Sequence, residues 1–465
     1  MREKIPIFKD DYKVSEKVSL REGYIAQTRE YELITPLFGG GVEPGNADPV
    51  TTIRATEIRG HLRFWWRATR CGQFDEKLEN MKEAENKLWG AASKPGYARP
   101  SEVRVATRVI SEGNAVTPYE KYRKGRSRAQ ANIAPPYAAF PLQPTQDEMT
   151  IGLKSKTLRS NVRFLLTLEY PQGKAEEVEA AIWAWELFGG IGARTRRGFG
   201  AICLTNGDDL VKIPEQLNSV DDVSEWLAGE LENTPYVKDE RPPDKISHLR
   251  FDPLFELTGI ERNAHNAWSN LIELYRKFRQ QRPDGNPTPG RSKWPEPEFI
   301  RDLTRQRHDR HQPIPYLRNI RRFPRAAFGL PIIFQFKDHD KKNPLGQRSD
   351  PRPTSLRLFD SERLASPLIL RPLKLARDKF VGVALALEGV LMPNKMKLIL
   401  EDSGLTERFR RNSNLPTKDF LLANLDITQA HSLKMKDNKT PLMFGKDDVV
   451  MAFLEYLKSE RGKKR

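Results

Sequence analysis

Cysteine is scarce in this chain of 465 residues, where it occurs only at Cys71 and Cys203. Two such distant cysteines exclude a disulfide scaffold and favour a reducing compartment. Neither belongs to a CxxC pair, so the spacing that is typical of a zinc site is missing. We therefore expect no metal centre.

Long hydrophobic runs and the common catalytic motifs are also missing. No stretch approaches the ~18 apolar residues of a membrane span, and the first residues, MREKIPIFKDDYK, contain no apolar signal core. HExxH, GxSxG and GxxxxGK[ST] do not occur, and the dinucleotide pattern GxGxxG fails at Thr195. We therefore expect a cytoplasmic protein with no membrane partner, no catalytic residue and no cofactor.

Positive charge, by contrast, is abundant. The 78 lysines and arginines outnumber the 62 acidic residues and give a net charge of +16, which points to nucleic acid or another acidic surface. The cations gather at 54–70, 121–128 and 301–325, and aromatic side chains lie among them. Because cations neutralise phosphates and aromatic faces stack on unpaired bases, this pattern favours an RNA-binding surface.

The first basic stretch has the spacing of an amphipathic helix. Over residues 51–71, apolar residues recur at helical spacing and arginines recur one position later, so the two stripes run side by side. Of the two adjacent tryptophans, we expect Trp65 in the core and Trp66 at the RNA. In the three stretches together, the predicted RNA contacts are Arg54, Arg59, His61, Arg63, Trp66, Arg67, Arg70, Lys124, Arg126, Arg321 and Arg322.

Residues 189–200, GGIGARTRRGFG, place three arginines in a glycine run. Ordered glycines permit positive φ and close backbone approach, and arginine suits phosphate. A helix pattern precedes the loop and a strand pattern follows it, which is the reverse of a nucleotide-binding turn. We expect RNA contacts from Arg194, Arg196, Arg197 and Phe199, in a loop shaped by Gly189, Gly190, Gly192, Gly198 and Gly200. A tight turn with solvated arginines is the plainer alternative.

The order of the predicted elements indicates the fold class. Strand patterns at 28–38, 101–110, 162–170 and 201–204 alternate with helix patterns in 51–71 and 176–188. This is the β-α-β-β-α-β order of a ferredoxin-like (RRM-like) domain. We expect an α+β fold with three regions: an N-terminal ferredoxin-like domain over 1–204, a linker region over 205–246, and a second ferredoxin-like domain with helical and loop insertions over 247–465.

Histidines suggest two further kinds of chemistry. His61 could act as the general base of a metal-independent RNA cleavage, although a half-buried helix residue or a phosphate contact is the commoner role. His308 and His311 lie three apart, a spacing that could hold a metal, but no third ligand is evident and arginines surround them. For this pair we favour a solvated basic face.

Five stretches match a known family in order. ITPLFGGG and IRATEIRGHLRFWWR look like its first strand and first helix, LFGGIGARTRRGFG like its glycine-rich loop, and AAFGLPIIFQF and RLASPLILRPL like its C-terminal half. Together they resemble the RAMP superfamily of CRISPR proteins, and within it the subunit-one family of type III-B (Cmr) effector complexes. The resemblance covers most of the chain, although 205–300 and 390–465 match in architecture only.

This resemblance implies two ferredoxin-like domains and a place in an RNA-guided antiviral ribonucleoprotein. It implies a non-catalytic subunit at the tip of the complex that binds the 3′ part of the guide (CRISPR) RNA and nearby target RNA, beside other RAMP subunits. Two alternatives stay open. One is a metal-independent endoribonuclease that processes guide RNA, and the other is a structural capping subunit that binds mainly protein partners.

Overall fold

Antiparallel strands and amphipathic helices alternate along the chain and give a mixed α+β protein, so the fold class is confirmed at that level. Cys71 and Cys203 are free thiols. Among the described helices, none is long and apolar enough to cross a lipid bilayer. The computed structural model describes residues 21–41, 51–94, 97–122, 126–144, 148, 156–238, 240–243, 246–250, 252–282, 291–317, 320–336, 338, 348–359, 363–389, 395–401, 419–426 and 442–463.

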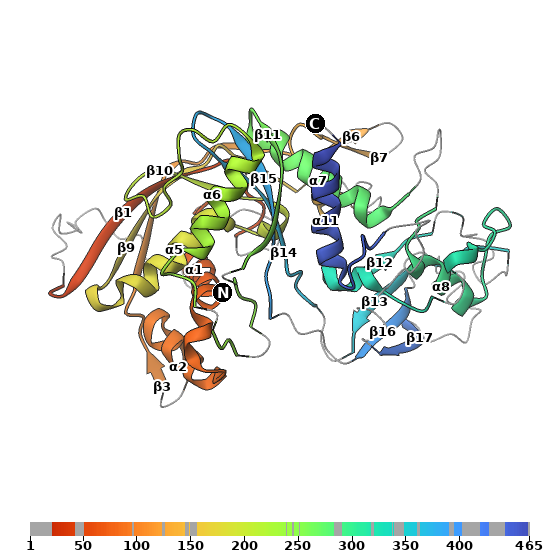
Figure 1. The fold of residues 1–465 in the computed structure, drawn as a ribbon, viewed down its shortest axis with the longest axis horizontal. Coiled ribbons are helices and arrows are strands. Elements are labelled where there is room, and N and C mark those ends of the chain that lie inside the picture. The colour runs from red at the N-terminus through yellow and green to blue at the C-terminus, as the bar shows by residue number, and fades with distance from the viewer. Residues whose placement is uncertain are drawn as a thin grey trace, which may run out of the picture.

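The N-terminal half is built on a four-stranded antiparallel sheet. Its strands are β1 (Tyr24–Leu33), β4 (Arg104–Ser111), β9 (Arg163–Pro171) and β10 (Ile202–Asn206), in the order β10-β1-β9-β4. Every second residue of β9 is buried, as expected of a strand with one face on a core. Helices α1 (Ala55–Arg70) and α5 (Ala175–Phe188) pack side by side against this sheet (Figure 1). The predicted β-α-β-β-α-β order is observed here.

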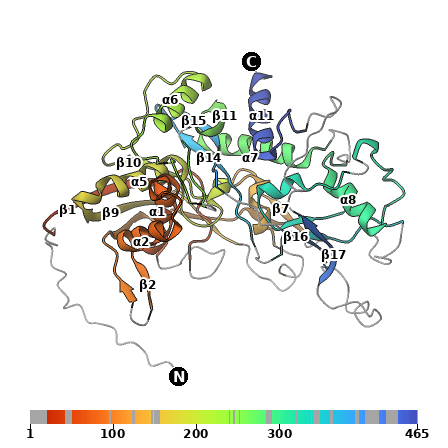
Figure 2. The same ribbon diagram turned by 60° about the horizontal axis from the view of Figure 1, so that its bottom comes forward.

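Several shorter elements are attached to this half. Helix α2 (Leu78–Trp89) follows α1 and leads into a hairpin of β2 (Ala91–Lys94) and β3 (Tyr97–Arg99), which projects beyond α2 (Figure 2). A second hairpin is formed by β6 (Tyr119–Tyr122) and β7 (Arg126–Ala129). The remaining elements are β5 (Asn114–Val116), α3 (Pro136–Ala139) and β8 (Leu158–Ser160).

The region predicted as a linker contains helix α6 (Val220–Glu232). The helix begins with a capping box, in which Ser219 and Asp222 satisfy each other's free backbone N–H groups. Val223, Leu227 and Leu231 are buried in the main core. The region therefore contributes to the packing of the protein.

The C-terminal half has a three-stranded antiparallel sheet in the order β11-β15-β14. Its strands are β11 (Leu254–Glu261), β14 (Leu368–Lys374) and β15 (Phe380–Ala386), and its helices are α7 (Ala264–Gln280) and α11 (Val449–Gly462). All of β15 is buried, because alternate residues face the N-terminal core and the α7–α11 layer. A four-stranded sheet is expected of a second ferredoxin-like domain, but among the described residues this sheet has three strands.

An insertion into this half forms its own small core at one end of the molecule (Figure 1). A four-stranded sheet lies in the order β12-β13-β16-β17, and Ile300, Phe323, Leu356 and Leu398 are buried against one another. Its elements are α8 (Pro295–Thr304), β12 (Ile332–Phe334), β13 (Thr354–Leu358), β16 (Lys395–Glu401) and β17 (Asp419–Asp426).

The two halves are joined through Arg371 of β14, a buried side chain. Its guanidinium donates hydrogen bonds to Glu186 O (2.9 Å), Gly189 O (2.8 Å) and Ile202 O (2.8 Å). The first two carbonyls end α5, and the third lies at the start of β10. The last carbonyls of a helix have no partner within the helix, so Arg371 supplies donors that α5 lacks.

Replacing Arg371 tests this joint. Arg371→Met keeps most of the volume but leaves three buried carbonyls unsatisfied, at ~1–3 kcal/mol each. We expect the Tm in calorimetry to fall by at least ~5 °C, whereas Arg377→Met, at an exposed position nearby, leaves it unchanged. Equal Tm values for the two variants would contradict the assignment.

Candidate nucleic-acid interface

The Gly-Arg loop, residues 189–200, connects α5 to β10 and packs against the C-terminal half. Gly198 has a φ of +81°, and a Cβ there would lie 2.5 Å from Trp268 Nε1, so the position requires glycine. The same indole nitrogen donates a 2.7 Å hydrogen bond to Arg197 O. At Gly200 a Cβ would lie 1.9 Å from Ile191 O. Glycine therefore lets the loop approach α7 at Gly198 and fold back on itself at Gly200.

The three loop arginines bind backbone carbonyls of other segments. Arg194 donates a hydrogen bond to Ala138 O (3.1 Å), Arg196 donates one to Ser366 O, and Arg197 donates one to Leu368 O (3.0 Å). Burial, with the charge of Arg197 adding to it, lowers the pKa of Arg194 and Arg196 to about 10, so both stay charged at neutral pH. The geometry favours a joint between the halves, and RNA contact by these arginines stays a prediction.

The basic stripe of α1 is paired with acidic side chains of neighbouring helices. Arg63 Nε lies 2.8 Å from Glu85 Oε1 of α2, and Arg67 binds the same oxygen. Arg70 is buried, and its guanidinium lies 2.8 Å from Glu177 Oε1 of α5. The prediction that Arg70 contacts RNA is wrong, because its donors hold two helices together.

The remaining cations of α1 are half-buried. Arg54 Nη2 donates to Gly41 O at 3.3 Å, and Arg59 lies one turn further along the helix, with its Nε buried and without a hydrogen-bond partner among the described residues. Like Arg63 and Arg67, they keep part of their surface in solvent. Their contact with RNA stays a prediction.

Two of the predicted aromatic contacts are core residues. Trp66 is buried, as Trp65 is, and its Nε1 donates a 2.6 Å hydrogen bond to Glu177. Phe199 is also buried, with its ring centroid 4.9 Å from that of Trp268. Neither ring can stack on a base in this fold, so both predictions are wrong. The wide apolar face of α1 accommodates both tryptophans because α5 packs beside it.

Exposed cations and an exposed ring meet on the β6–β7 hairpin. Tyr122 pairs with Arg126 across the strands, and Glu120 pairs with Arg128. Side chains alternate along a strand, so these four residues share one face. Tyr122 is 47% exposed, and the Arg128 guanidinium lies 5.8 Å from its ring centroid. We call Tyr122, Arg126 and Arg128 the hairpin face.

A neighbouring turn adds a second exposed ring. Phe140, in the turn η3 (Phe140–Leu142), is 55% exposed. Gln143 Nε2 donates to Ser127 Oγ of β7 at 3.1 Å, which ties the turn to the hairpin. Phe140 was not among the predicted contacts, although an aromatic residue in a proline-rich stretch after a basic tract is a usable signal. Lys124, in the same tract, lies outside the described residues.

The third basic stretch lies in the C-terminal half. Arg321 is exposed and Arg322 is half-buried, just before the turn η7 (Pro324–Phe328). Both lie in a different part of the chain from the hairpin face. Their RNA contact also stays a prediction.

Comparison with known proteins shows which family the N-terminal half resembles. A sequence model of the RAMP superfamily matches residues 30–203, which include most of the N-terminal sheet and the whole Gly-Arg loop. Two curated proteins that are similar to this chain are the CRISPR system Cmr subunits Cmr1-1 and Cmr1-2 of Pyrococcus furiosus. They are 21% identical over 241 residues (50% of this chain, 66% of the relative) and 27% identical over 184 residues (37% and 91%).

Solved structures of Cmr proteins are similar to this chain as well. The crystal structure of Cmr1 from Pyrococcus furiosus (apo form) covers 80% of this chain and 90% of its own, at 18% identity and a TM-score of 0.45. A chain of the type III-B Cmr-beta complex, bound to cognate target RNA and AMPPnP, covers 94% and 99%, at 13% identity and a TM-score of 0.47.

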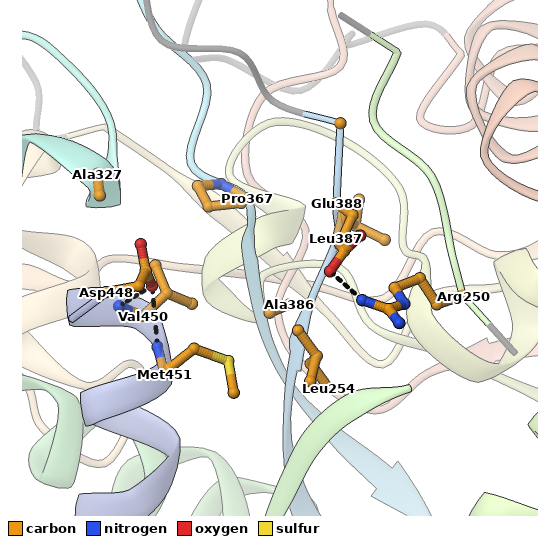
Figure 3. A pocket seen from close by; sticks show the side chains of 11 residues that line it. Arg250, Leu254, Ala327, Pro367, Ala386, Leu387, Glu388, Asp448, Val450 and Met451 are labelled. Carbon is orange, nitrogen blue, oxygen red and sulfur yellow. Dashed lines mark hydrogen bonds and ion pairs between the residues drawn. The ribbon is translucent and has the colours of Figure 1, made fainter. Parts of the chain in front are cut away.

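A cavity of about 440 Å³ opens between β15 and the start of α11 (Figure 3). Among the described residues that line it, Arg250 is the one cation, and it lies 2.6 Å from Glu388. Asp448 accepts a hydrogen bond from Val450 N (2.7 Å) and caps α11. Two carboxylates and a paired arginine do not favour a phosphate, so this cavity is a poor RNA site.

Helix α1 also carries a buried carboxylate beside the Gly-Arg loop. Glu57 Oε1 accepts a 2.8 Å hydrogen bond from Gly192 N, and burial raises the pKa of Glu57 to about 7. His61 lies one turn later, with Nε2 4.0 Å from the same oxygen. Burial lowers the pKa of His61 to about 4, so its imidazole is neutral at pH 7.

The raised pKa of Glu57 predicts a pH-dependent stability. In the folded protein the Glu57 carboxyl stays protonated up to about pH 7, whereas in the unfolded chain it loses its proton at the ordinary pKa of 4.5. The contribution of the protonated carboxyl to stability is therefore full below pH 4.5 and is lost as the pH rises towards 7. Glu57→Gln keeps an acceptor for Gly192 N and removes the charge. We expect equal Tm values near pH 5 and a variant more stable by ~1–2 kcal/mol at pH 8.

Thermal unfolding of both proteins across this pH range measures the difference. The titration of His61 is common to both and cancels in the comparison. A difference in Tm that does not change with pH would contradict the raised pKa.

Proposed function

We propose that this protein is a non-catalytic RNA-binding subunit of a type III-B (Cmr) RNA-guided effector complex. The observation that carries the proposal is the hairpin face, because it presents an aromatic ring and two arginines to solvent. The match to the RAMP superfamily model and the similarity to Cmr1 proteins support it. Its partners are then guide RNA, target RNA and other RAMP subunits, at the tip of the complex near the 3′ part of the guide. The cytoplasmic location stays a prediction.

The hairpin face suits single-stranded RNA for physical reasons. Arg126 and Arg128 flank Ser127, the residue that pairs with Lys121. Their donors can bind successive phosphates. The rings of Tyr122 and Phe140 offer flat surfaces on which unpaired bases stack whatever their identity. Such a surface reads no sequence, which fits a system in which base pairing with the guide carries the sequence information.

We also propose that both halves are ferredoxin-like units of one duplicated plan. The N-terminal sheet order supports this, and so does the pairing β11-β15-β14 around α7, which repeats three strands of the same pattern. The linker region and the insertion are then additions to these two units.

Binding of RNA to the triple variant Tyr122→Ala/Arg126→Ala/Arg128→Ala tests the hairpin face. We expect the Kd for a single-stranded RNA of guide length to rise at least ~tenfold. The slope of log affinity against log salt should flatten by ~1.4, because two phosphate contacts of ~0.7 each are lost. Fluorescence anisotropy in EDTA at several salt concentrations measures both quantities.

The matched control is Arg241→Ala/Arg377→Ala, which removes two exposed arginines elsewhere on the surface. It lowers the net charge by the same amount and should leave both the Kd and the slope nearly unchanged. Equal losses in the two variants would mean that overall charge, and not the hairpin face, binds the RNA. No binding by the wild-type chain would favour the structural capping subunit.

The endoribonuclease alternative depends on His61. This residue lines a cavity of about 200 Å³ with Arg196 and the rings of Phe64 and Trp65. Ligand pockets usually measure ~300–1,000 Å³, so the cavity is small for the nucleotides on either side of a scissile bond. The position of His61 therefore favours a packing role over catalysis.

A denaturing gel of the same binding reactions decides between these roles. We expect RNA to stay intact in EDTA with the wild-type chain and with His61→Ala alike. Cleavage that disappears in His61→Ala would establish the nuclease in place of the proposed function.

A further inference from the structure

The insertion of the C-terminal half brings a histidine and two carboxylates together. His311 Nε2 lies 2.7 Å from Asp338 Oδ2 and 3.4 Å from Asp350 Oδ2. One ligand atom of each residue lies within 4.8 Å of the other two. The three residues come from separate segments, so the spacing of His308 and His311 along the chain gives no hint of the two aspartates.

These distances are close to those that a bound metal requires. A tetrahedral zinc ion with bonds of ~2.0–2.2 Å holds its ligand atoms ~3.3–3.5 Å apart. The contact from His311 to Asp350 already has this length. The His311–Asp338 contact, now a 2.7 Å hydrogen bond, needs to open by only ~0.6 Å to reach the lower limit of that spacing.

Asp350 is oriented as a metal ligand usually is. Arg301 donates from Nε to Oδ1 and from Nη2 to Oδ2, both at 2.9 Å, and His308 N lies 3.3 Å from Oδ1. A carboxylate oxygen has two lone pairs, so Oδ2 keeps one that is directed at His311. Hydrogen bonds of this kind fix ligating carboxylates in metal sites. Asp350 is buried and Asp338 is 37% exposed, which leaves an approach from solvent.

The charge of the surrounding network is an independent argument. A network of ion pairs connects four carboxylates to three arginines and His311. The carboxylates are those of Glu298, Asp302, Asp338 and Asp350, and the arginines are Arg291, Arg301 and Arg307. When His311 is neutral, one negative charge is left over within this described network. Asp338 has His311 as its one side-chain partner there, so the excess lies where a cation can reach it. A neutral imidazole is also the form that binds metals.

We propose that His311, Asp338 and Asp350 bind a zinc ion, with water completing the coordination. One imidazole and two carboxylates are ligands that zinc accepts. The ion would connect the loop after α8 to both ends of the 338–350 segment and would stabilise the insertion. The expectation of no metal centre considered only neighbours in sequence. The proposal is independent of RNA binding at the hairpin face.

Zinc titration of the full chain tests the site. The protein is stripped with EDTA, dialysed and titrated with zinc chloride in a calorimeter, and its Tm is measured with and without zinc. We expect ~one zinc per chain and a rise in Tm, because the ligand binds only the folded state. Asp338→Asn and His311→Ala should each weaken binding at least ~tenfold and abolish most of the rise in Tm.

Asp302→Asn is the matched control. It removes a carboxylate from the same network, but Asp302 pairs with Arg307 and does not face His311, so zinc affinity should stay within ~twofold of the wild type. Absence of zinc binding by the wild-type chain would overturn the proposal. Zinc binding that survives both ligand variants, or that falls equally in Asp302→Asn, would overturn it too, since the ion would then lie elsewhere or respond to charge alone.

Discussion

A buried arginine with three carbonyl partners holds the two halves of this protein together. Arg371 has no carboxylate partner among the described residues, and its charge faces the C-terminal end of α5. The aligned peptide dipoles give that end a partial negative charge. Burying a cation costs several kcal/mol unless its donors are satisfied, so α5, β10 and β14 must keep their relative positions. The place of the Gly-Arg loop follows, because the loop starts where α5 ends and stops where β10 begins.

The Gly-Arg loop illustrates why sequence alone does not reveal which acceptors an arginine binds. A guanidinium binds phosphate oxygens and backbone carbonyl oxygens with the same donors. The acceptors of Arg196 and Arg197 lie 170 and 171 residues further along the chain, so no local pattern reveals them. Close approach at a loop glycine is observed within the protein. Gly198 lies against Trp268 and Leu370 of β14, which only the fold brings near.

Elements with a strong period could be predicted, whereas side-chain environments that depend on a second layer could not. Helices α1 and α5 and strand β9 follow their apolar spacing. Trp66 was placed at the RNA because one apolar stripe was assumed, but α5 gives α1 a wider buried face. The β6–β7 hairpin was missed because strands rich in lysine and arginine have low intrinsic β propensity, and this one is supported by the turn that follows it.

The net charge counts two groups of arginines together, those paired with carboxylates inside the protein and those exposed on its surface. In the 301–325 stretch, Arg301, Arg307 and Arg325 pair with carboxylates of the insertion and contribute little field to the surface. On α1, Arg63, Arg67 and Arg70 are paired as well. A net charge of +16 therefore says that an acidic partner is plausible but not where it binds. On the hairpin face, Arg126 and Arg128 are exposed and form no ion pair with the described residues, although Glu120 lies opposite Arg128. This exposure is why the proposal favours the hairpin face over the longer basic stretches.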